Sequence, residues 1–245
     1  MEKDRITRFD TLGENLYTDD RIPGRKGLHI VQIEQDVKTA GPSPFDNKRL
    51  EIFFSGCQKA VAGIPCPGCF NQITWKTDNL SYSHDPVLFA KRISEICGDN
   101  KNVTIGGGEP LDQIDNLIIL CKEMKKYNIH IIMYTWRRLK ELLKPYYVIG
   151  GSKEELFEHI IGKKKINKLL EYVDVIIDGQ YKQEERLWDG NKEDGLISSV
   201  GSGNQIVWDI KNKKGYRMDS LNGLSLRDNK LIFDIKEEKN DINSF

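Results

Sequence analysis

Strand-like and helix-like segments alternate along the middle of the chain, which leaves few folds open to it. Four short apolar runs predict strands at residues 50–54, 102–105, 129–134 and 173–177. Two amphipathic segments lie between them, one that begins with the capping residue Asp85 and the first-turn proline Pro86, and one over residues 114–124. Strands that alternate with helices build βαβ units around a mostly parallel sheet. The sequence therefore predicts the α/β fold class.

Further elements are expected on both sides of this region. The first strand is predicted at residues 28–33, after an irregular N-terminal arm over residues 1–27. Helical segments are predicted over residues 137–144 and 154–172. The charged end of the chain, from Lys236 onward, is expected to be solvated and disordered.

Polar or glycine-rich segments directly follow several of the predicted strands. These segments are the cysteine loop at residues 57–69, residues 106–110, residues 134–135 and residues 178–179. In parallel α/β folds the carboxyl ends of the strands meet at one edge of the sheet, and ligands bind there. Because four separate segments fall at this edge, the sequence predicts a ligand site along it.

Composition limits the classes of ligand and the cellular compartment that fit the chain. The 245 residues include 37 Lys and Arg against 37 Asp and Glu, so the net charge is zero, which argues against a protein that mainly neutralises nucleic acid. A charged N-terminus and the lack of a long apolar run predict a cytoplasmic protein with no membrane segment. Thiols stay reduced there, so the five cysteines favour metal binding or catalysis over disulfides. Cys97 and Cys121 fall at apolar helical positions and are expected in the core.

The other three cysteines, Cys57, Cys66 and Cys69, follow the second predicted strand. Thiolates two residues apart, as at Cys66 and Cys69, can bind one metal centre from a tight turn. Three nearby thiolates suit a four-iron cluster that keeps one iron open for another ligand. Two alternatives remain open on spacing alone: a zinc site completed by a histidine such as His84, and plain buried thiols.

The segment at residues 106–110 is Gly-Gly-Gly-Glu-Pro, so three residues without side chains stand at the end of a predicted strand. Backbone N–H and C=O groups exposed in this way can reach a ligand, and Glu109 adds a carboxylate. A tight turn between a strand and a helix explains the glycines equally well, so this segment gains meaning only together with the others.

Taken together, the motifs resemble those of the radical S-adenosylmethionine superfamily, which joins a cysteine trio to a Gly-Gly-Glu-Pro segment. The resemblance narrows to the family of anaerobic ribonucleotide reductase activating proteins, which are glycyl-radical activases. The segments that carry it are residues 57–71, 107–110, 134–136, 172–181 and 201–205. The chain departs from the family pattern in several places, among them an apparent insertion at residues 41–49 and Ile206 where arginine is common. Eight residues separate Cys57 from Cys66 where the family has three, and Trp136 stands where the family prefers glycine.

The resemblance implies a place for each part of the cofactor. Cys57, Cys66 and Cys69 would bind three irons of a 4Fe-4S cluster, and S-adenosyl-L-methionine would bind the fourth iron. The residues implied in cofactor binding are Phe70, Gly107, Gly108, Glu109, Pro110, Thr135 and Asp178, and those implied in partner binding are Asn204 and Gln205. Other interpretations stay open: Phe70 as a core aromatic, Asp178 as a turn residue, and Asn204 with Gln205 as the closure of a turn.

The resemblance also implies a fold and a reaction. Residues 28–210 would form a partial (β/α) barrel with mostly parallel strands, and residues 211–245 a C-terminal extension and tail. The implied reaction is reductive cleavage of S-adenosylmethionine, which generates a glycyl radical on an anaerobic (class III) ribonucleotide reductase, with an electron donor such as flavodoxin. No catalytic residue is implied beyond the cluster and cofactor. Two other functions stay open: a radical enzyme that acts on a small molecule or peptide, and a non-catalytic zinc-binding module.

Overall fold

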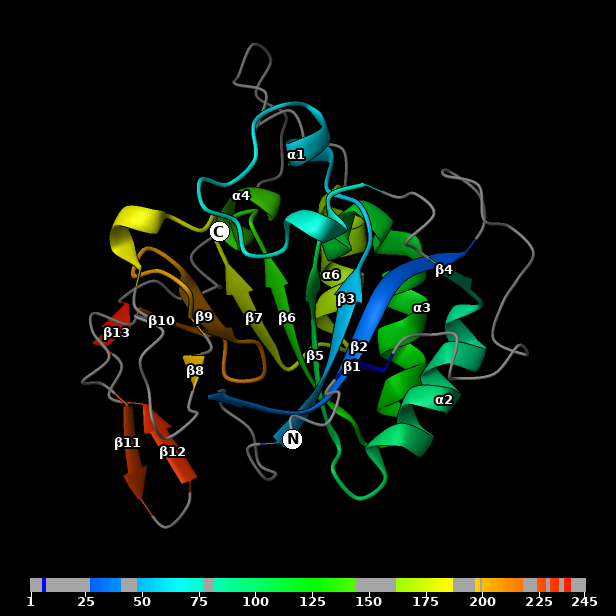
Figure 1. The fold of residues 1–245 in the computed structure, drawn as a ribbon. Helices are drawn as coiled ribbons and strands as arrows, with labels where there is room; N and C mark the ends of the chain where they lie inside the picture. Colours follow the sequence, from blue (N-terminus) through cyan, green and yellow to red (C-terminus); the bar gives the residue numbers. More distant parts are fainter. Residues whose placement is uncertain are drawn as a thin grey trace, which may run out of the picture.

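One large mixed sheet dominates the computed structural model of the chain (Figure 1). The structure describes residues 6–7, 27–40, 48–76, 82–143, 162–186, 197–198, 200–217, 224–227, 230–233 and 236–238. Helices cover one face of this sheet, and the ends of its central strands point toward the cysteine loop (Figure 1). The chain is therefore of the α/β class, as the alternation of its segments predicts.

Four parallel strands form the centre of the sheet. They are β3 (Lys48–Phe54), β5 (Asn102–Gly107), β6 (His130–Thr135) and β7 (Val175–Asp178). β5 pairs in parallel with β3 on one side and with β6 on the other, and β7 pairs in parallel with β6. Each observed strand begins and ends within two residues of a predicted one, so the predicted strands and their parallel arrangement are confirmed.

Antiparallel strands flank this centre on both sides. β2 (Leu28–Ala40) pairs with β3, and β9 (Ile206–Asp209) pairs with β7. The outer strands on β2 are β1 (Ile6–Thr7), β4 (Tyr82–His84) and β8 (Ile197–Ser198). The outer strands beyond β9 are β10 (Lys214–Arg217) and β13 (Lys236–Glu238). β1 and β13 stand at opposite ends of the strand order, so the sheet is not closed.

Strand predictions near the ends of the chain are wrong in three respects. Residues 6–7 form β1 rather than part of an irregular arm, and residues 236–238 form β13 rather than a disordered tail. β2 continues to Ala40, well beyond the predicted end of the first strand. Short or polar strands are stabilised by their partner strands, which the periodicity of their own residues does not reveal. A separate two-stranded sheet pairs β11 (Leu224–Arg227) with β12 (Lys230–Phe233).

Helices α2 (Pro86–Cys97), α3 (Ile114–Lys125) and α6 (Lys163–Leu170) pack on one face of the sheet (Figure 1). Their apolar side chains and those of the facing strand residues form one buried core. This core includes Cys97 and Cys121, so both cysteines are core thiols as predicted. The cysteines of the loop after β3 lie outside this core, which leaves them available to a ligand.

Helix α2 illustrates how far the local sequence determines an element. The side chain of Asp85 accepts hydrogen bonds from the backbone N–H groups of Val87 and Leu88, both at 2.9 Å, so the predicted cap is confirmed. α4 (Leu139–Leu142) is shorter than the helix predicted over residues 137–144. Residues 154–161 of the other predicted helical segment lie outside the described residues. Among the described helices, none has the length and apolar character needed to cross a membrane.

Candidate functional site

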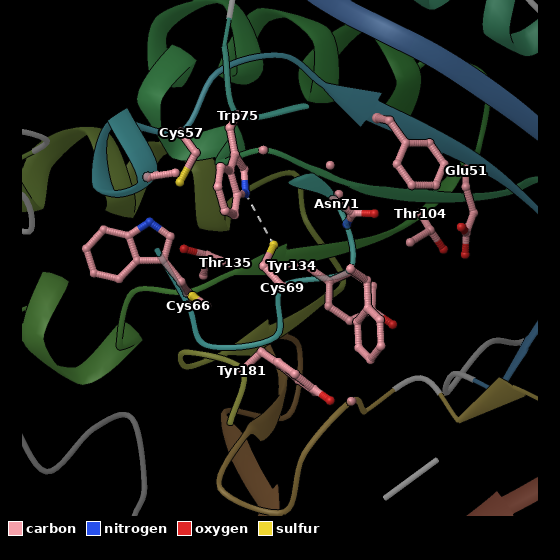
Figure 2. Close-up of a pocket in the computed structure, with 18 of the residues that line it drawn as sticks. Glu51, Cys57, Cys66, Cys69, Asn71, Trp75, Thr104, Tyr134, Thr135 and Tyr181 are labelled. Carbon is pink, nitrogen blue, oxygen red and sulfur yellow. Dashed lines mark hydrogen bonds between the residues drawn. The ribbon is translucent and has the colours of Figure 1, made fainter. Parts of the chain in front are cut away.

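A pocket of about 470 Å³ opens at the carboxyl ends of the parallel strands (Figure 2). All four strand-end segments singled out in the sequence contribute to its lining. The loop after β3 contributes Cys57, Cys66 and Cys69. The last residue of β6 contributes Thr135, and Gly179 directly follows β7. The predicted gathering of these segments at one edge of the sheet is therefore confirmed.

The cysteine loop contains a short helix, α1 (Gln58–Val61), which fills much of the eight-residue gap between the first two cysteines. The backbone N–H of Gln58 donates a hydrogen bond to the carboxylate of Asp112 at 2.7 Å, so α1 is tied to the segment after β5. Lys59 on this helix is 1% exposed, and its ammonium lies 5.1 Å from the centroid of the Trp136 ring. The unusual spacing of the cysteines therefore builds an ordered wall of the pocket.

The three thiols differ in their surroundings. Burial raises the pKa of the Cys57 thiol to about 12 and that of the Cys66 thiol to about 11. Thiols with these pKa values are protonated at neutral pH unless a metal displaces the proton. The sulfur of Cys69 accepts a hydrogen bond from the indole N–H of Trp75 at 3.4 Å (Figure 2). Metal binding at this loop therefore releases protons and becomes weaker at low pH.

A zinc site is not formed in the part of the chain that the structure describes. No group of three His, Cys, Asp or Glu side chains there could hold a metal ion. His84, the candidate fourth ligand, is fully buried in β4 and its ring lies 4.7 Å from that of Phe89. A four-iron cluster is larger than one ion, so its thiolate ligands stand farther apart. Three thiols that line one pocket are the ligand number that a four-iron cluster with one open iron requires.

The glycine-rich segment packs directly against the backbone that precedes the cysteines. The N–H of Gly108 donates to the carbonyl of Phe54 at 2.8 Å, and the N–H of Glu109 donates to the carbonyl of Gly56 at 2.7 Å. A Cβ on Gly108 would lie 2.1 Å from the Gly56 oxygen. Gly107 has a φ of +97°, and a Cβ there would lie 2.5 Å from the nitrogen of Phe54. Close approach of two backbones therefore requires both glycines.

Glu109 links the ends of two parallel strands. Its carboxylate, fully buried, accepts hydrogen bonds from the Thr135 hydroxyl at 2.9 and 3.1 Å and from the backbone N–H of Trp136 at 3.1 Å. The Arg137 guanidinium lies 4.0 Å away and also pairs with Asp112. Burial raises the pKa of Glu109 to about 7, although the charge of Arg137 opposes this shift. Glu109 and its neighbour Pro110 are buried and do not line the pocket.

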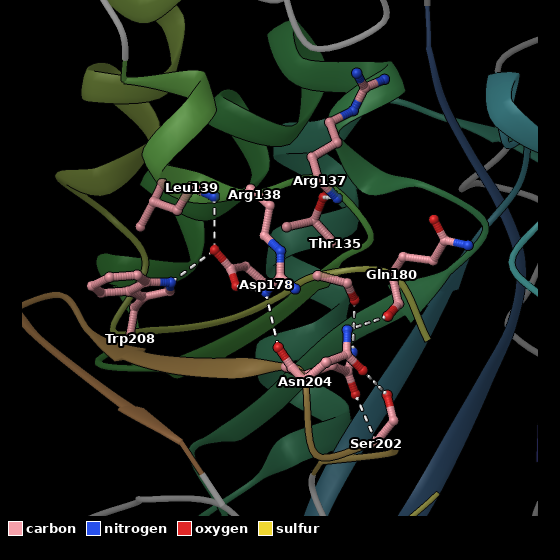
Figure 3. A network of polar contacts seen from close by, with 11 residues as sticks. Thr135, Arg137, Arg138, Leu139, Asp178, Gln180, Ser202, Asn204 and Trp208 are labelled. Atoms are coloured by element: carbon pink, nitrogen blue, oxygen red, sulfur yellow. Dashed lines mark hydrogen bonds and ion pairs between the residues drawn. The ribbon is translucent and has the colours of Figure 1, made fainter. Parts of the chain in front are cut away.

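Asp178 stands at the end of β7 and is bonded to protein groups (Figure 3). Its carboxylate accepts hydrogen bonds from the backbone N–H of Leu139 at 2.7 Å, from the indole N–H of Trp208 at 2.8 Å and from Arg138 at 3.2 Å. Burial raises the pKa of this carboxyl group. Asp178 does not line the pocket, whereas the next residue, Gly179, does. The contacts of Asp178 thus join β7 to β9 and to the start of α4.

Asn204 and Gln205 lie in the turn that leads into β9, and both are nearly buried. The Asn204 amide donates to the carbonyl of Gln180 at 2.8 Å (Figure 3), and the Gln205 amide donates to the carbonyl of Gly179 at 3.0 Å. The Gln205 oxygen accepts from the backbone N–H of Gly201 at 2.9 Å, and Gln205 also lines the pocket. Both side chains therefore close this turn, and Gln205 in addition faces the pocket.

Phe70 lines the pocket and is 53% exposed, so the alternative of a core aromatic is wrong. Its ring centroid lies 4.6 Å from that of Tyr181, and the Arg186 guanidinium lies 5.7 Å from the Phe70 ring. An exposed aromatic ring at the edge of a pocket offers a flat surface to a planar ligand group. The position agrees with the place that the family resemblance gives to Phe70.

Several residues of the site escaped the sequence reasoning. Trp75 and Arg137 contact site residues from outside the recognised motifs, and Asp112 pairs with Arg137. Lys59 lies within the cysteine loop and contacts Trp136. Trp75 stands six residues after the last cysteine of the trio, a spacing from which its contact with that cysteine could have been suspected. The two charged residues after β5 and β6 gave no comparable signal, because pairing depends on strands that meet only in the fold.

The residues present fit a thiolate-bound cluster with a small cofactor beside it. Three thiols line the same pocket as the glycine backbone. A Cβ on Gly106 would meet only the Tyr134 ring within 4 Å, at 3.8 Å, so the missing side chain leaves room in the pocket. Thiolates suit iron–sulfur clusters, and a strand end without side chains lets a small ligand approach the backbone. The donor set and the space beside it are therefore compatible with both groups.

Three thiols and the glycine-rich segment lie together at the carboxyl ends of parallel strands. This arrangement defines an iron–sulfur protein of the α/β class. The family described as a 4Fe-4S single cluster domain matches residues 46–208, most of the chain, and the chain belongs to this family. Together with the relatives described next, this match confirms the resemblance found in the sequence: the chain is a member of the radical S-adenosylmethionine activases.

The chain is similar to two curated reductase-activating proteins over most of their length, and to a third activating enzyme over a shorter part. It is 25% identical over 171 residues to the anaerobic ribonucleoside-triphosphate reductase-activating protein of Haemophilus influenzae. The aligned region covers 68% of this chain and 90% of that relative. It is 28% identical over 162 residues to the protein of the same name from Enterobacteria phage T4, covering 62% and 85%. The pyruvate formate-lyase-activating enzyme of Streptococcus mutans is 31% identical over 106 residues, covering 40% of this chain and 38% of that enzyme.

Proposed function

We propose that this chain is the activase of an anaerobic (class III) ribonucleotide reductase, on which it generates a glycyl radical by reductive cleavage of S-adenosylmethionine. The observation that carries the proposal is the shared pocket of Cys57, Cys66, Cys69 and the glycine-rich backbone. The names of two relatives that match over most of their own length support the choice of partner. An external one-electron donor, such as a flavodoxin, belongs to the proposal.

The three loop cysteines would hold three irons of the cluster, and the backbone of Gly107 and Gly108 would receive the amino group of S-adenosylmethionine. When bound, the cluster and this cofactor supply the one-electron chemistry that removes a hydrogen atom from a glycine. Phe70 offers its exposed ring to the adenine. The role of the protein is to position the reacting groups and to keep water away from them.

Other residues of the site would act through structure. Glu109 and Pro110 fix the glycine-rich segment, and Thr135 holds the Glu109 carboxylate while also lining the pocket. Asp178 would support the part of the pocket that holds the cofactor. It would do so by fixing the position of its neighbour Gly179, which lines the pocket. Asn204 and Gln205 would shape the turn that a glycine-bearing loop of the partner approaches.

The proposal includes a fold for the core. Residues 28–210 would be a partial (β/α) barrel of the radical S-adenosylmethionine type, preceded by the arm at residues 1–27 and followed by the extension at residues 211–245. Four parallel strands with helices on one face, and an edge that does not close, support this arrangement. An open side suits an enzyme whose substrate is a loop of another protein rather than a small molecule.

Iron and sulfide content after oxygen-free purification tests the cluster first. We expect about four of each per chain in the wild type, a large loss in Cys66→Ala, and wild-type content in the matched control Cys97→Ala, which removes a core thiol. One zinc per chain and no sulfide would contradict the cluster.

The partner requires its own experiment. The reduced holoenzyme, S-adenosylmethionine and an anaerobic ribonucleotide reductase should together give a glycyl radical signal by electron paramagnetic resonance. Cofactor cleavage without this signal would leave a radical enzyme that acts on a small molecule or peptide.

A further inference from the structure

Trp75 touches both ends of the cysteine trio. Its backbone carbonyl accepts a hydrogen bond from the N–H of Cys57 at 2.9 Å. Its indole N–H donates to the sulfur of Cys69 at 3.4 Å, the contact drawn as a dashed line in Figure 2. One residue therefore connects the first and the last of the three candidate ligands, although neither cysteine is its sequence neighbour.

The backbone on both sides of Trp75 is held by hydrogen bonds, and on its far side the carbonyl of Lys76 accepts from the Ser55 hydroxyl at 3.2 Å. The residue follows a short 3-10 helix over Gln72–Thr74. The carbonyl of Thr74 accepts from the N–H of Gly56 at 2.7 Å, and the Thr74 hydroxyl donates to the carbonyl of Asn71 at 2.7 Å. The indole therefore points into the pocket from a rigid support, and Trp75 is among the residues that line it.

A second tryptophan lines the same pocket and provides a contrast. The indole nitrogen of Trp136 is buried and has no hydrogen-bond partner among the described residues. Its ring lies close to two cations, with the Lys59 ammonium 5.1 Å and the Arg137 guanidinium 4.7 Å from its centroid. The two indoles thus share the pocket, and in the described structure that of Trp75 donates to a cysteine sulfur while that of Trp136 does not.

A hydrogen bond to a ligand sulfur affects a cluster in a defined direction. A donor stabilises negative charge on the thiolate, and a reduced cluster carries one more negative charge than an oxidised one. Hydrogen bonds to the sulfurs are among the factors that set the potential of a cluster. Donation to Cys69 therefore favours the reduced form and raises the reduction potential.

We infer that Trp75 is a positioning residue of the cysteine loop, and that its N–H···S bond to Cys69 raises the reduction potential of the bound cluster. The inference rests on the proposed function, because it needs a cluster at Cys57, Cys66 and Cys69. A residue that only helped the loop to fold would change the amount of cluster bound and not its potential.

The test compares Trp75→Phe with Trp136→Phe in the reconstituted holoenzyme, without S-adenosylmethionine. Both variants replace an indole by a ring that cannot donate, and the first should retain the loop because the carbonyl of residue 75 still accepts from Cys57. Iron and sulfide are measured first, and the cluster is then titrated reductively, with electron paramagnetic resonance as the readout. We expect Trp75→Phe to have a lower midpoint potential than the wild type and Trp136→Phe to match the wild type.

The outcomes separate a failure of the proposed function from a failure of the inference about Trp75. A wild type that takes up no cluster overturns the proposed function and this inference together. A loaded Trp75→Phe at the wild-type potential overturns the inference alone. Trp75→Leu is a second variant that also lacks a hydrogen-bond donor, and it should show the same downward shift. If neither variant takes up iron while circular dichroism stays native, Trp75 serves loop formation only and the inference is overturned.

Discussion

The Thr135 hydroxyl donates to both carboxylate oxygens of Glu109, at 2.9 and 3.1 Å, across the ends of strands β6 and β5. Both side chains are buried. A buried carboxylate that loses a donor keeps the cost of its desolvation, so this contact joins the glycine-rich segment to the neighbouring strand.

Replacement of Thr135 by Val should therefore lower stability. We expect the free energy of unfolding to fall by about 1–3 kcal/mol, because the buried carboxylate loses its hydroxyl donor. Thr135→Ser keeps the hydroxyl and serves as the control. Urea denaturation of both variants without cluster measures the difference, and equal stability of the Val and Ser variants would contradict this role of the hydroxyl.

Glu51 should make stability depend on pH. Burial, and then the charge of Glu34, raise its pKa to about 7, above the ordinary 4.5 of a glutamate. A proton thus binds more tightly in the folded chain, so the contribution of Glu51 to stability is fully present below about pH 4.5 and is lost as the pH rises through about 7.

The variant Glu51→Gln should remove that part of the pH dependence. The unfolding free energy of the wild type should fall relative to this variant between about pH 4.5 and 7. Glu95→Gln, at an exposed position on α2, is the matched control and should follow the wild type. Parallel slopes for all three proteins would show that Glu51 does not bind the proton.

Asp178→Asn separates a structural role from a cofactor contact. The amide cannot accept at both oxygen positions that now bind Leu139, Trp208 and Arg138, so we expect a loss of about 1–3 kcal/mol in unfolding free energy. The exposed Asp115→Asn should cost less than about 0.5 kcal/mol. If Asp178→Asn is as stable as the wild type but binds S-adenosylmethionine more weakly, Asp178 contacts the cofactor.

Phe70→Ala should affect binding more than folding. Because the ring is 53% exposed, we expect a change in unfolding free energy of about 0.5 kcal/mol or less. Loss of an aromatic contact should weaken the binding of S-adenosylmethionine to the holoenzyme by about 2- to 10-fold. Ile73→Ala, in the same loop, 62% exposed and outside the pocket lining, is the control. Equal affinities of the two variants would remove Phe70 from the cofactor site.

Local signals in the sequence predicted much of the fold. Three such signals act over a few residues each: the cap and proline of α2, the apolar runs of β5 to β7, and the glycines at the end of β5. Each appears in the structure close to its predicted place. The sequence also placed the three cysteines at the correct edge of the sheet. It could not predict β13, because that strand depends on a partner in β10.

Long-range contacts account for what the sequence did not reveal in the site. Glu109 looked like a carboxylate offered to a ligand, yet its oxygens are used by Thr135 and Trp136, which lie 26 and 27 positions away. Asp178 is likewise occupied by Leu139 and Trp208. Motif spacing reports which residues share an edge of the sheet. It does not report whether a side chain at that edge faces the pocket or the protein.

The backbone contact between Gly56 and Gly108 has a mechanical consequence. These residues stand directly before the first cysteine and within the glycine-rich segment, and they touch with no space for a side chain between them. The N–H of Glu109 also bonds the Gly56 carbonyl, so neither strand end can shift without carrying the other. The proposed partner would therefore meet a site in which the first cysteine and the glycine-rich segment keep their relative position during docking.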